Sequence, residues 1–225
     1  MNVGASNPAR VVRYLDLDAF LATPLTRHPY DYVIVPGFVR EDCREKINAD
    51  YPRIPERGTY PVGSYPHGTG FQELLDELES REFRRAFEEK FQIDLTGRPT
   101  MITVRGQCAI EDGQIHTDSK KKIIAALIYM NSRWESADGR LRLLRSADNL
   151  DDMVAEVPPT WTLVAFRRAH NSWHGHRPFA GERRVVQLHW VTSELYRSTQ
   201  ILRHYKSALS KRMLGAISLG RWRIS

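Results

Sequence analysis

The sequence predicts an α+β fold, with helices in the first 99 residues and a strand-rich core at residues 100–191. Two patterns predict it. Apolar residues recur at helical spacing between residues 71 and 91, and short β-rich runs bounded by turn residues follow from Met101 onward. A basic helix and tail are expected at residues 192–225. A chain of 225 residues is commonly one domain, and we expect a single domain over residues 1–225.

Three elements are expected before residue 50. They are a short helix, a β-rich strand and a charged helix, at residues 15–21, 30–35 and 41–49. Pro36 and Gly37 end the strand. Cys43 and Ile47 lie four residues apart, which places both on the inward face of the second helix.

Residues 51–71 combine repeated Pro and Gly with Tyr60, Tyr65 and His67, a composition that disfavours regular structure. This loop is either a lid over a functional site or an ordinary surface connection. Helical spacing resumes at residues 71–78 and 83–91, where the aromatic stripe is expected in the core. These helices should cover one face of a sheet.

The second half of the chain predicts a barrel. Strands are expected at residues 101–109, 123–130, 140–145, 161–166 and 183–191. The continuous apolar run at 123–130 suits a strand covered on both faces, whereas the acidic, Pro-terminated segment 146–159 is expected as an exposed connection. With the histidine-bearing segments, the core has about eight strands, the number expected of a double-stranded β-helix, also called a jelly roll or cupin-type barrel.

Two histidines and an aspartate in this core are candidate metal ligands. Strand alternation sends His116 and Asp118 to one face and leaves Thr117 pointing away. His174 lies in a later segment of the same core. Two imidazoles and one carboxylate on one face of a metal leave its other positions open, which is the arrangement of non-heme Fe(II) oxygenases.

A guanidinium downstream of His174 would let the site bind a carboxylate-bearing co-substrate as well. Arg184 has the parity of the apolar positions 186, 188 and 190, which suits a strand whose apolar side lines the barrel. Arg183 is the alternative. In that case Gln187 and His189 would line the cavity instead.

Other polar residues compete for roles near the site. His170 and His176 share strand parity with His174, and we expect them, like His189, to be structural or substrate-facing rather than ligands. Arg105 and Gln107 lie on the strand before His116 and could each face the co-substrate or the substrate.

The order of these residues resembles the Fe(II)- and 2-oxoglutarate-dependent dioxygenases, in particular their prolyl-hydroxylase-like branch. The signature of that family is HxD, then a distal His, then a basic residue, and it is matched by His116-Thr-Asp118, His174 and Arg184. The resemblance covers residues 100–191. It extends to the opening strand and helix of the family, at Val33, Pro36, Gly37, Phe38 and Cys43.

The resemblance implies an enzyme that holds Fe(II) with His116, Asp118 and His174. Arg184, ten residues after His174 as is usual in the family, and Tyr129 of the YxN pattern would bind the far carboxylate of 2-oxoglutarate. With O2, such an enzyme converts 2-oxoglutarate to succinate and CO2 and hydroxylates an unactivated carbon. Asp118 favours hydroxylation, because radical halogenases of the superfamily have a small residue there.

Two alternative functions remain open. One is a cupin-like metal-binding protein without oxygenase turnover, which would not need the carboxylate clamp. The other is a protein prolyl hydroxylase. A nucleic-acid-associated protein is disfavoured, because the sequence has no recognisable reading motif and no interleaved aromatic and basic platform.

The formal net charge of +6 favours an anionic partner, and we expect a polar or acidic small-molecule substrate. Cys43 and Cys108 have no paired spacing, which indicates a reduced, cytoplasmic setting. We find no secretion signal pattern and no run of membrane-spanning length.

The C-terminal region is expected to be a basic amphipathic helix. Its apolar positions on one helical face are Leu195, Leu202, Tyr205, Leu209 and Met213. It is either packed on the barrel with a solvated cationic face or an anionic docking surface for a membrane, polymer or carrier protein.

Overall fold

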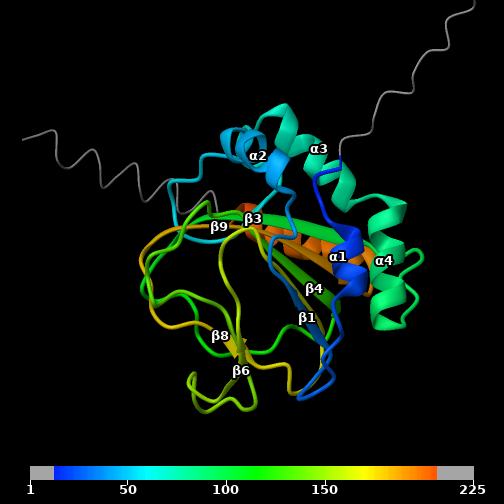
Figure 1. The fold of residues 1–225 in the computed structure, drawn as a ribbon, viewed down its shortest axis with the longest axis vertical. Helices are drawn as coiled ribbons and strands as arrows, with labels where there is room; N and C mark the ends of the chain where they lie inside the picture. The colour runs from blue at the N-terminus through cyan, green and yellow to red at the C-terminus, as the bar shows by residue number, and fades with distance from the viewer. Residues whose placement is uncertain (1–12, 207–225) are drawn as a thin grey trace, which may run out of the picture.

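The computed structural model describes residues 13–206 and contains two antiparallel sheets with helices beside the larger one (Figure 1). The larger sheet has the strand order β1-β7-β4-β9-β3-β2. Its strands are β1 (Tyr32–Val35), β2 (Tyr60–Pro61), β3 (Thr100–Cys108), β4 (Lys122–Tyr129), β7 (Leu163–Arg167) and β9 (Gly181–Val191). The smaller sheet has the order β6-β5-β8, with β5 (Arg142–Leu144), β6 (Met153–Glu156) and β8 (His174–Gly175). A mixed fold with antiparallel sheets and few helices is therefore confirmed.

Strand β4 lies in the middle of the larger sheet and is buried on both faces, as its continuous apolar run predicts. Ile124, Ala126 and Ile128 belong to the core cluster on the helix side. Leu127 and Tyr129 belong to a second cluster on the opposite face. Because side chains alternate between the two faces of a strand, β4 contributes residues to two separate hydrophobic clusters.

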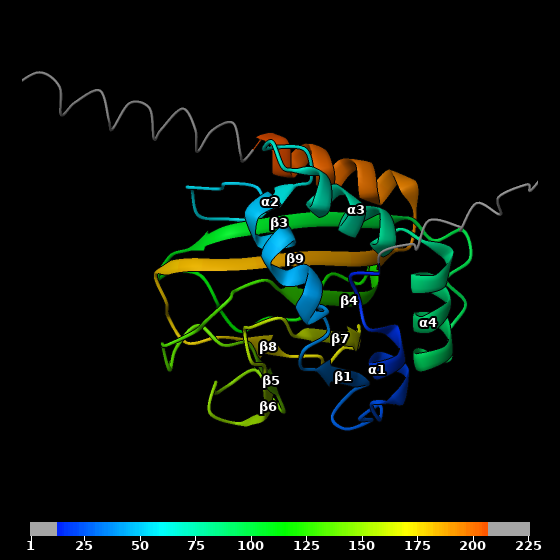
Figure 2. The ribbon, with the colours of Figure 1, turned by 45° about the horizontal axis from the view of Figure 1, so that its top comes forward.

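Helices cover one face of the larger sheet (Figure 2). They are α1 (Leu17–Ala22), the short 3₁₀ helix η1 (Glu41–Cys43), α2 (Arg44–Asp50), α3 (Thr69–Leu78) and α4 (Arg81–Phe91). Ser80 caps α4 by accepting a hydrogen bond of 3.1 Å from the Phe83 N–H. Phe83 and Phe87 pack on Trp190 of β9, so the predicted aromatic stripe is confirmed as core.

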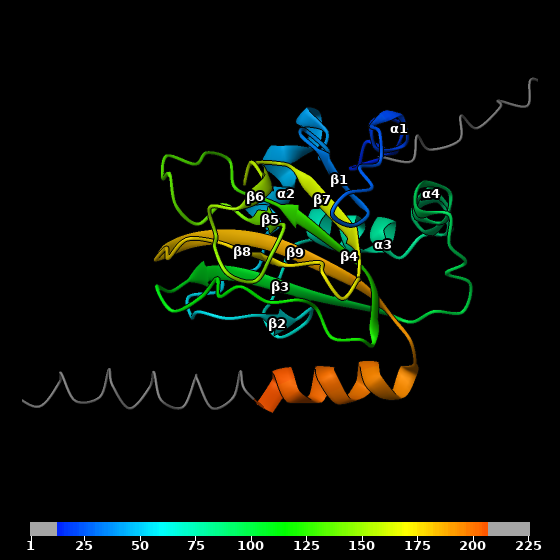
Figure 3. The ribbon, with the colours of Figure 1, turned by 90° about the horizontal axis from the view of Figure 1, so that it is seen from below.

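Residues 194–206 are helical, as expected after the last strand, but the predicted apolar face is exposed in the described part of this helix. Leu195, Leu202 and Tyr205 are 79%, 55% and 44% exposed, because other faces of the helix are turned toward the protein. Leu209 and Met213 lie outside the described residues. Figure 3 shows this helical segment, in orange, running beside the edge of the larger sheet that is formed by β3 and β2. Within residues 13–206, no helix has the length and apolar character needed to cross a bilayer.

Two further segments differ from the prediction. The expected exposed connection at 146–159 contains β6, an edge strand that pairs with β5 and shows no apolar alternation from which it could be recognised. The expected loop at 51–71 contains β2, where Tyr60 pairs with Val104 and is buried. Tyr60 is therefore a core residue, and Thr59 is the residue of this segment that reaches the candidate site.

Candidate metal centre

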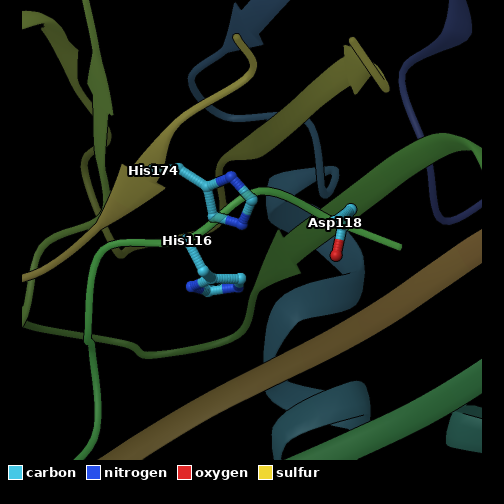
Figure 4. Close-up of side chains that lie close together, drawn as sticks. All are labelled: His116, Asp118 and His174. Carbon is cyan, nitrogen blue, oxygen red and sulfur yellow. The ribbon is translucent and has the colours of Figure 1, made fainter. Parts of the chain in front are cut away.

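His116, Asp118 and His174 come together as a candidate metal-binding group (Figure 4). One nitrogen or oxygen atom from each residue lies within 4.8 Å of the corresponding atoms of the other two. Asp118 and His174 are buried, whereas His116 is exposed. The group therefore has a closed side formed by protein and an open side where further ligands could approach a metal.

The backbone sets the distance between the two imidazoles. His116 and His174 face each other across an isolated antiparallel bridge, with reciprocal N–H to carbonyl hydrogen bonds of 3.0 Å. Their ring centroids are 4.4 Å apart. His174 opens β8, whose other edge pairs with β5. Two residues 58 positions apart in the sequence are thus directly opposite in space.

Hydrogen bonds to carbonyl oxygens fix the tautomer of both histidines. Nδ1 of His116 lies 2.8 Å from the Gln114 carbonyl oxygen, and Nδ1 of His174 lies 3.0 Å from the Ser172 carbonyl oxygen. A carbonyl can only accept, so each Nδ1 carries the hydrogen and each Nε2 keeps a free lone pair. This is the orientation in which backbone groups hold metal-binding histidines.

The buried ligand candidates are also in the protonation states that a metal requires. Burial lowers the pKa of His174 to about 4, which leaves the imidazole neutral near pH 7. Burial alone would raise the pKa of Asp118, but the nearby charge of Lys122, followed by His189, outweighs it and the pKa is lowered. Lys122 Nζ donates a hydrogen bond of 2.6 Å to Asp118 Oδ1 and lies 3.0 Å from His189 Nε2.

A cavity of about 200 Å³ connects the metal-binding group to Arg183, which is 3% exposed. Arg183 Nε donates to the Gly139 carbonyl oxygen at 2.9 Å, and Nη2 donates to the Tyr129 hydroxyl oxygen at 3.0 Å. Among the described residues, no carboxylate lies within ion-pair distance of this guanidinium. A buried cation without a counter-ion is costly unless an anionic ligand compensates it.

Tyr129 does not line the cavity itself, but it is fully buried and contacts Arg183, which does. Burial raises the pKa of its hydroxyl, so the group keeps its hydrogen. Because its oxygen accepts from Arg183, the hydroxyl hydrogen remains for another acceptor. The Arg183 guanidinium also lies over the Tyr129 ring, 5.2 Å from the centroid.

The structure does not bring Arg184 to this cavity. Its Nε forms an ion pair of 3.0 Å with Glu182, and Nη1 donates to the side chain of Asn48. It lines a separate cavity that also contains Tyr51. The apolar positions of β9 that share its parity face the helix-side core, not the barrel interior. The alternative parity, with Arg183, Gln187 and His189 on the cavity side, is the one observed.

The neighbouring strand resolves another open question. The register of β3 on β9 shifts between Arg105 and Gln107, so these two residues lose their common face. Arg105 lines the metal-side cavity and pairs with Asp112 at 2.8 Å. Gln107 lines the separate cavity with Arg184.

Sequence reasoning missed Lys122 and the residues of the helical segment 194–206 that reach the site. Lys122 opens an otherwise apolar strand, and it is the fourth residue after Asp118. A second cavity, of about 390 Å³, is lined by the metal-binding residues His116 and Asp118, by Lys122 and by the helix residues Tyr196, Gln200, Arg203 and His204. A polar residue at the start of a buried strand is the signal that could have indicated Lys122.

The sequence and the fold were compared with known proteins. Residues 107–192 match the family model described as the 2OG-Fe(II) oxygenase superfamily. No curated protein matches the chain. The family match confirms the predicted resemblance, and with it the predicted enzyme class, a 2-oxoglutarate-dependent oxygenase, and its requirement for Fe(II), 2-oxoglutarate and O2.

Solved structures show the same fold. A prolyl-4-hydroxylase from Pseudomonas putida is 17% identical, with 78% of this chain and 97% of that chain covered and a TM-score of 0.52. An oxidoreductase of the 2OG-Fe(II) oxygenase family from Burkholderia pseudomallei is 12% identical, with 71% and 84% covered and a TM-score of 0.50. At these identities the likeness concerns the fold alone.

Proposed function

From the match of residues 107–192 to the 2OG-Fe(II) oxygenase superfamily, we propose that this chain is an Fe(II)- and 2-oxoglutarate-dependent hydroxylase of a polar or acidic small molecule. His116, Asp118 and His174 would hold the metal, and Arg183 with Tyr129 would hold the far carboxylate of 2-oxoglutarate. The two antiparallel sheets, with the candidate site between them, support a double-stranded β-helix as the scaffold.

The donor set fits Fe(II). The group consists of one carboxylate and two imidazoles, and each imidazole has its Nδ1 against a carbonyl oxygen, which leaves Nε2 for a metal. When bound, Fe(II) supplies the activation of O2 that couples oxidative decarboxylation of 2-oxoglutarate to oxidation of a C–H bond. The balanced reaction converts a substrate C–H bond, 2-oxoglutarate and O2 into a substrate C–OH group, succinate and CO2.

The protein positions the co-substrate from its far end. Arg183 offers a planar fork of donors, and its hydrogen bonds to Gly139 and Tyr129 fix the orientation of that fork. A carboxylate bound there would compensate the buried charge and accept the remaining Tyr129 hydrogen. Burial also keeps water away from this contact, which strengthens it.

One observation carries the proposal: a single cavity is lined both by a candidate iron-binding group and by a buried arginine that has no carboxylate partner among the described residues. A dicarboxylate with a keto acid at one end could bind to both. A metal-binding protein without turnover would gain nothing from the second feature.

The test is an anaerobic titration of metal-free protein with Fe(II) and 2-oxoglutarate, followed by the visible charge-transfer band of the chelate. Wild type should give the band and, after O2 is admitted, succinate. His174→Ala should give neither, because it removes a nitrogen ligand. Ser172→Ala is the matched control, since it leaves the Ser172 carbonyl that holds the His174 ring.

A wild-type protein that binds a divalent metal but gives neither the band nor succinate would refute the oxygenase assignment and favour a cupin-like binding protein. A band that persists in His174→Ala would refute the assigned ligands while leaving the enzyme class intact.

A further inference from the structure

Two cavities meet at the metal-binding group. Both are lined by His116, Asp118 and Lys122. The smaller cavity, of about 200 Å³, runs to Arg183 and is assigned to 2-oxoglutarate under the proposed function. The larger one, of about 390 Å³, is not lined by Arg183 and is left for the molecule that is oxidised.

The helical segment 194–206 forms one wall of this larger cavity. Tyr196, Gln200, Arg203 and His204 line it, and their spacing places them on one face of the helix. A neighbouring face, with Arg197 and Ile201, lines a different cavity together with α3. The helix thus lines one cavity with α3 and another at the metal-binding group, and it runs beside the β3–β2 edge of the sheet (Figure 3).

The charges around the larger cavity do not balance. Asp118 contributes the one carboxylate among its described lining residues, and Lys122 already pairs with it at 2.6 Å. Arg203, which is exposed, adds a further positive charge to this lining. Within the described part of the chain, Arg203 has no carboxylate at ion-pair distance. A divalent metal bound to His116 and Asp118 would add further positive charge to the same cavity.

The remaining wall is polar rather than apolar. Besides the charged groups it contains Thr103, Ser119 and Gln187, which supply hydroxyl and amide groups at several positions around the cavity. Such a lining suits a small hydrophilic molecule and offers no extended groove of apolar side chains for a protein segment.

We propose that the helical segment 194–206 is part of the primary-substrate site and that Arg203 binds a carboxylate or phosphate group of a small-molecule substrate. This inference rests on the proposed function and specifies the substrate class. The anionic group is held at the helix wall, and the C–H bond that is oxidised lies toward His116 and Asp118. Arg203 is thus a specificity residue that does not contact the reacting carbon.

The experiment uses the full chain loaded with Fe(II) and 2-oxoglutarate, and a panel of matched small molecules. Carboxylic acids are paired with their primary amides, and phosphate monoesters with the parent alcohols. Substrate-dependent succinate formation is the readout. We expect stimulation by anionic members and not by their neutral partners, and the two arms show whether the site takes a carboxylate or a phosphate.

The best anionic substrate is then tested on Arg203→Gln. The Michaelis constant for this substrate should rise by about tenfold or more, because a hydrogen bond between charged groups is worth roughly 1.5–3 kcal/mol. The affinity for the co-substrate 2-oxoglutarate should stay within about twofold of wild type, because Arg203 does not line its cavity. Arg203→Lys should restore part of the loss. Arg197→Gln is the matched control, since it removes the same charge from the same helix but on the face beside α3.

Three results would overturn the inference: equal stimulation by neutral partners, stimulation by a proline-containing peptide but by no small anion, or an equal effect of Arg197→Gln and Arg203→Gln. Each can occur while the wild-type chelate band is intact, so the oxygenase assignment would survive, although stimulation by the peptide alone would replace the proposed small-molecule substrate with a protein one. Loss of the band in wild type is the separate sign that the proposed function itself has failed.

Discussion

The two faces of the larger sheet are built from the same strands but carry different chemistry. On the helix side, Val186, Leu188 and Trp190 of β9 belong to the main core cluster, where Trp190 packs on Phe87 of α4. On the other side, the intervening positions of β9 include Arg183 and His189, which line the cavity at the metal-binding group. Alternate side chains of β9 therefore have different roles: one set packs in the core, and the other set lines the cavity.

The candidate site lies on the face of the larger sheet that is less completely packed. The helix side is filled by rings in contact, such as Phe87 and Trp190 with centroids 4.8 Å apart. The cavity side also contains apolar residues, among them Leu127, Phe166 and Val185, but Leu127 and Phe166 line an open cavity together with polar residues. Since burial of charge is tolerated only with partners or ligands, the open side is where Arg183 can be held.

Trp190→Ala should have the largest effect, and it should act on stability. The side chain is 1% exposed and packs on Phe83 and Phe87. Removing it should lower the free energy of unfolding by roughly 3–5 kcal/mol, measured by urea denaturation. The affinity of the remaining folded protein for 2-oxoglutarate should be unchanged. If that affinity falls as well, the two faces are not independent.

Arg183→Gln should have the next largest effect, and it should act on ligand binding. Loss of two charged hydrogen bonds to the far carboxylate is expected to weaken 2-oxoglutarate binding by about a hundredfold, or roughly 3 kcal/mol. The chelate titration measures this. Arg184→Gln is the control, because Arg184 is on the helix-side parity and pairs with Glu182. Equal losses in both variants would contradict the assignment of the clamp to Arg183.

Tyr129→Phe should have the smallest effect of the three. It keeps the ring under the Arg183 guanidinium and removes only the hydroxyl that accepts from Nη2. The affinity for 2-oxoglutarate should fall by about fivefold, since one hydrogen bond is worth roughly 0.5–1.5 kcal/mol. An unchanged affinity would mean that the Tyr129 hydroxyl serves only to hold Arg183.

Much of this arrangement could be predicted from the sequence. The apolar run of β4 and the aromatic spacing of α4 identify their elements, because each pattern repeats over several turns or residues. His116, Asp118 and His174 could be named as a group, and the structure brings them together. Their role as ligands remains a proposal.

The choice between Arg183 and Arg184 could not be made from the strand alone. Apolar character on one side of a strand suggests the barrel interior, whereas the most apolar face of β9 packs against helices. Deciding between two buried faces requires knowing what covers each, which is tertiary information. Likewise, β6 and β8 are too short and too irregular to show a periodicity. Arg203 could not be predicted either, because the position of its helix against the sheet depends on tertiary contacts and not on a local sequence pattern.

The reciprocal backbone hydrogen bonds between His116 and His174 have a thermodynamic consequence. The imidazoles are spaced by the peptide chain itself before any metal binds, and the carbonyl contacts at each Nδ1 have already selected their ring orientations. Little conformational entropy is then left to lose on metal association. The centre is preorganised, so Fe(II) would bind to a template that exists before the metal arrives.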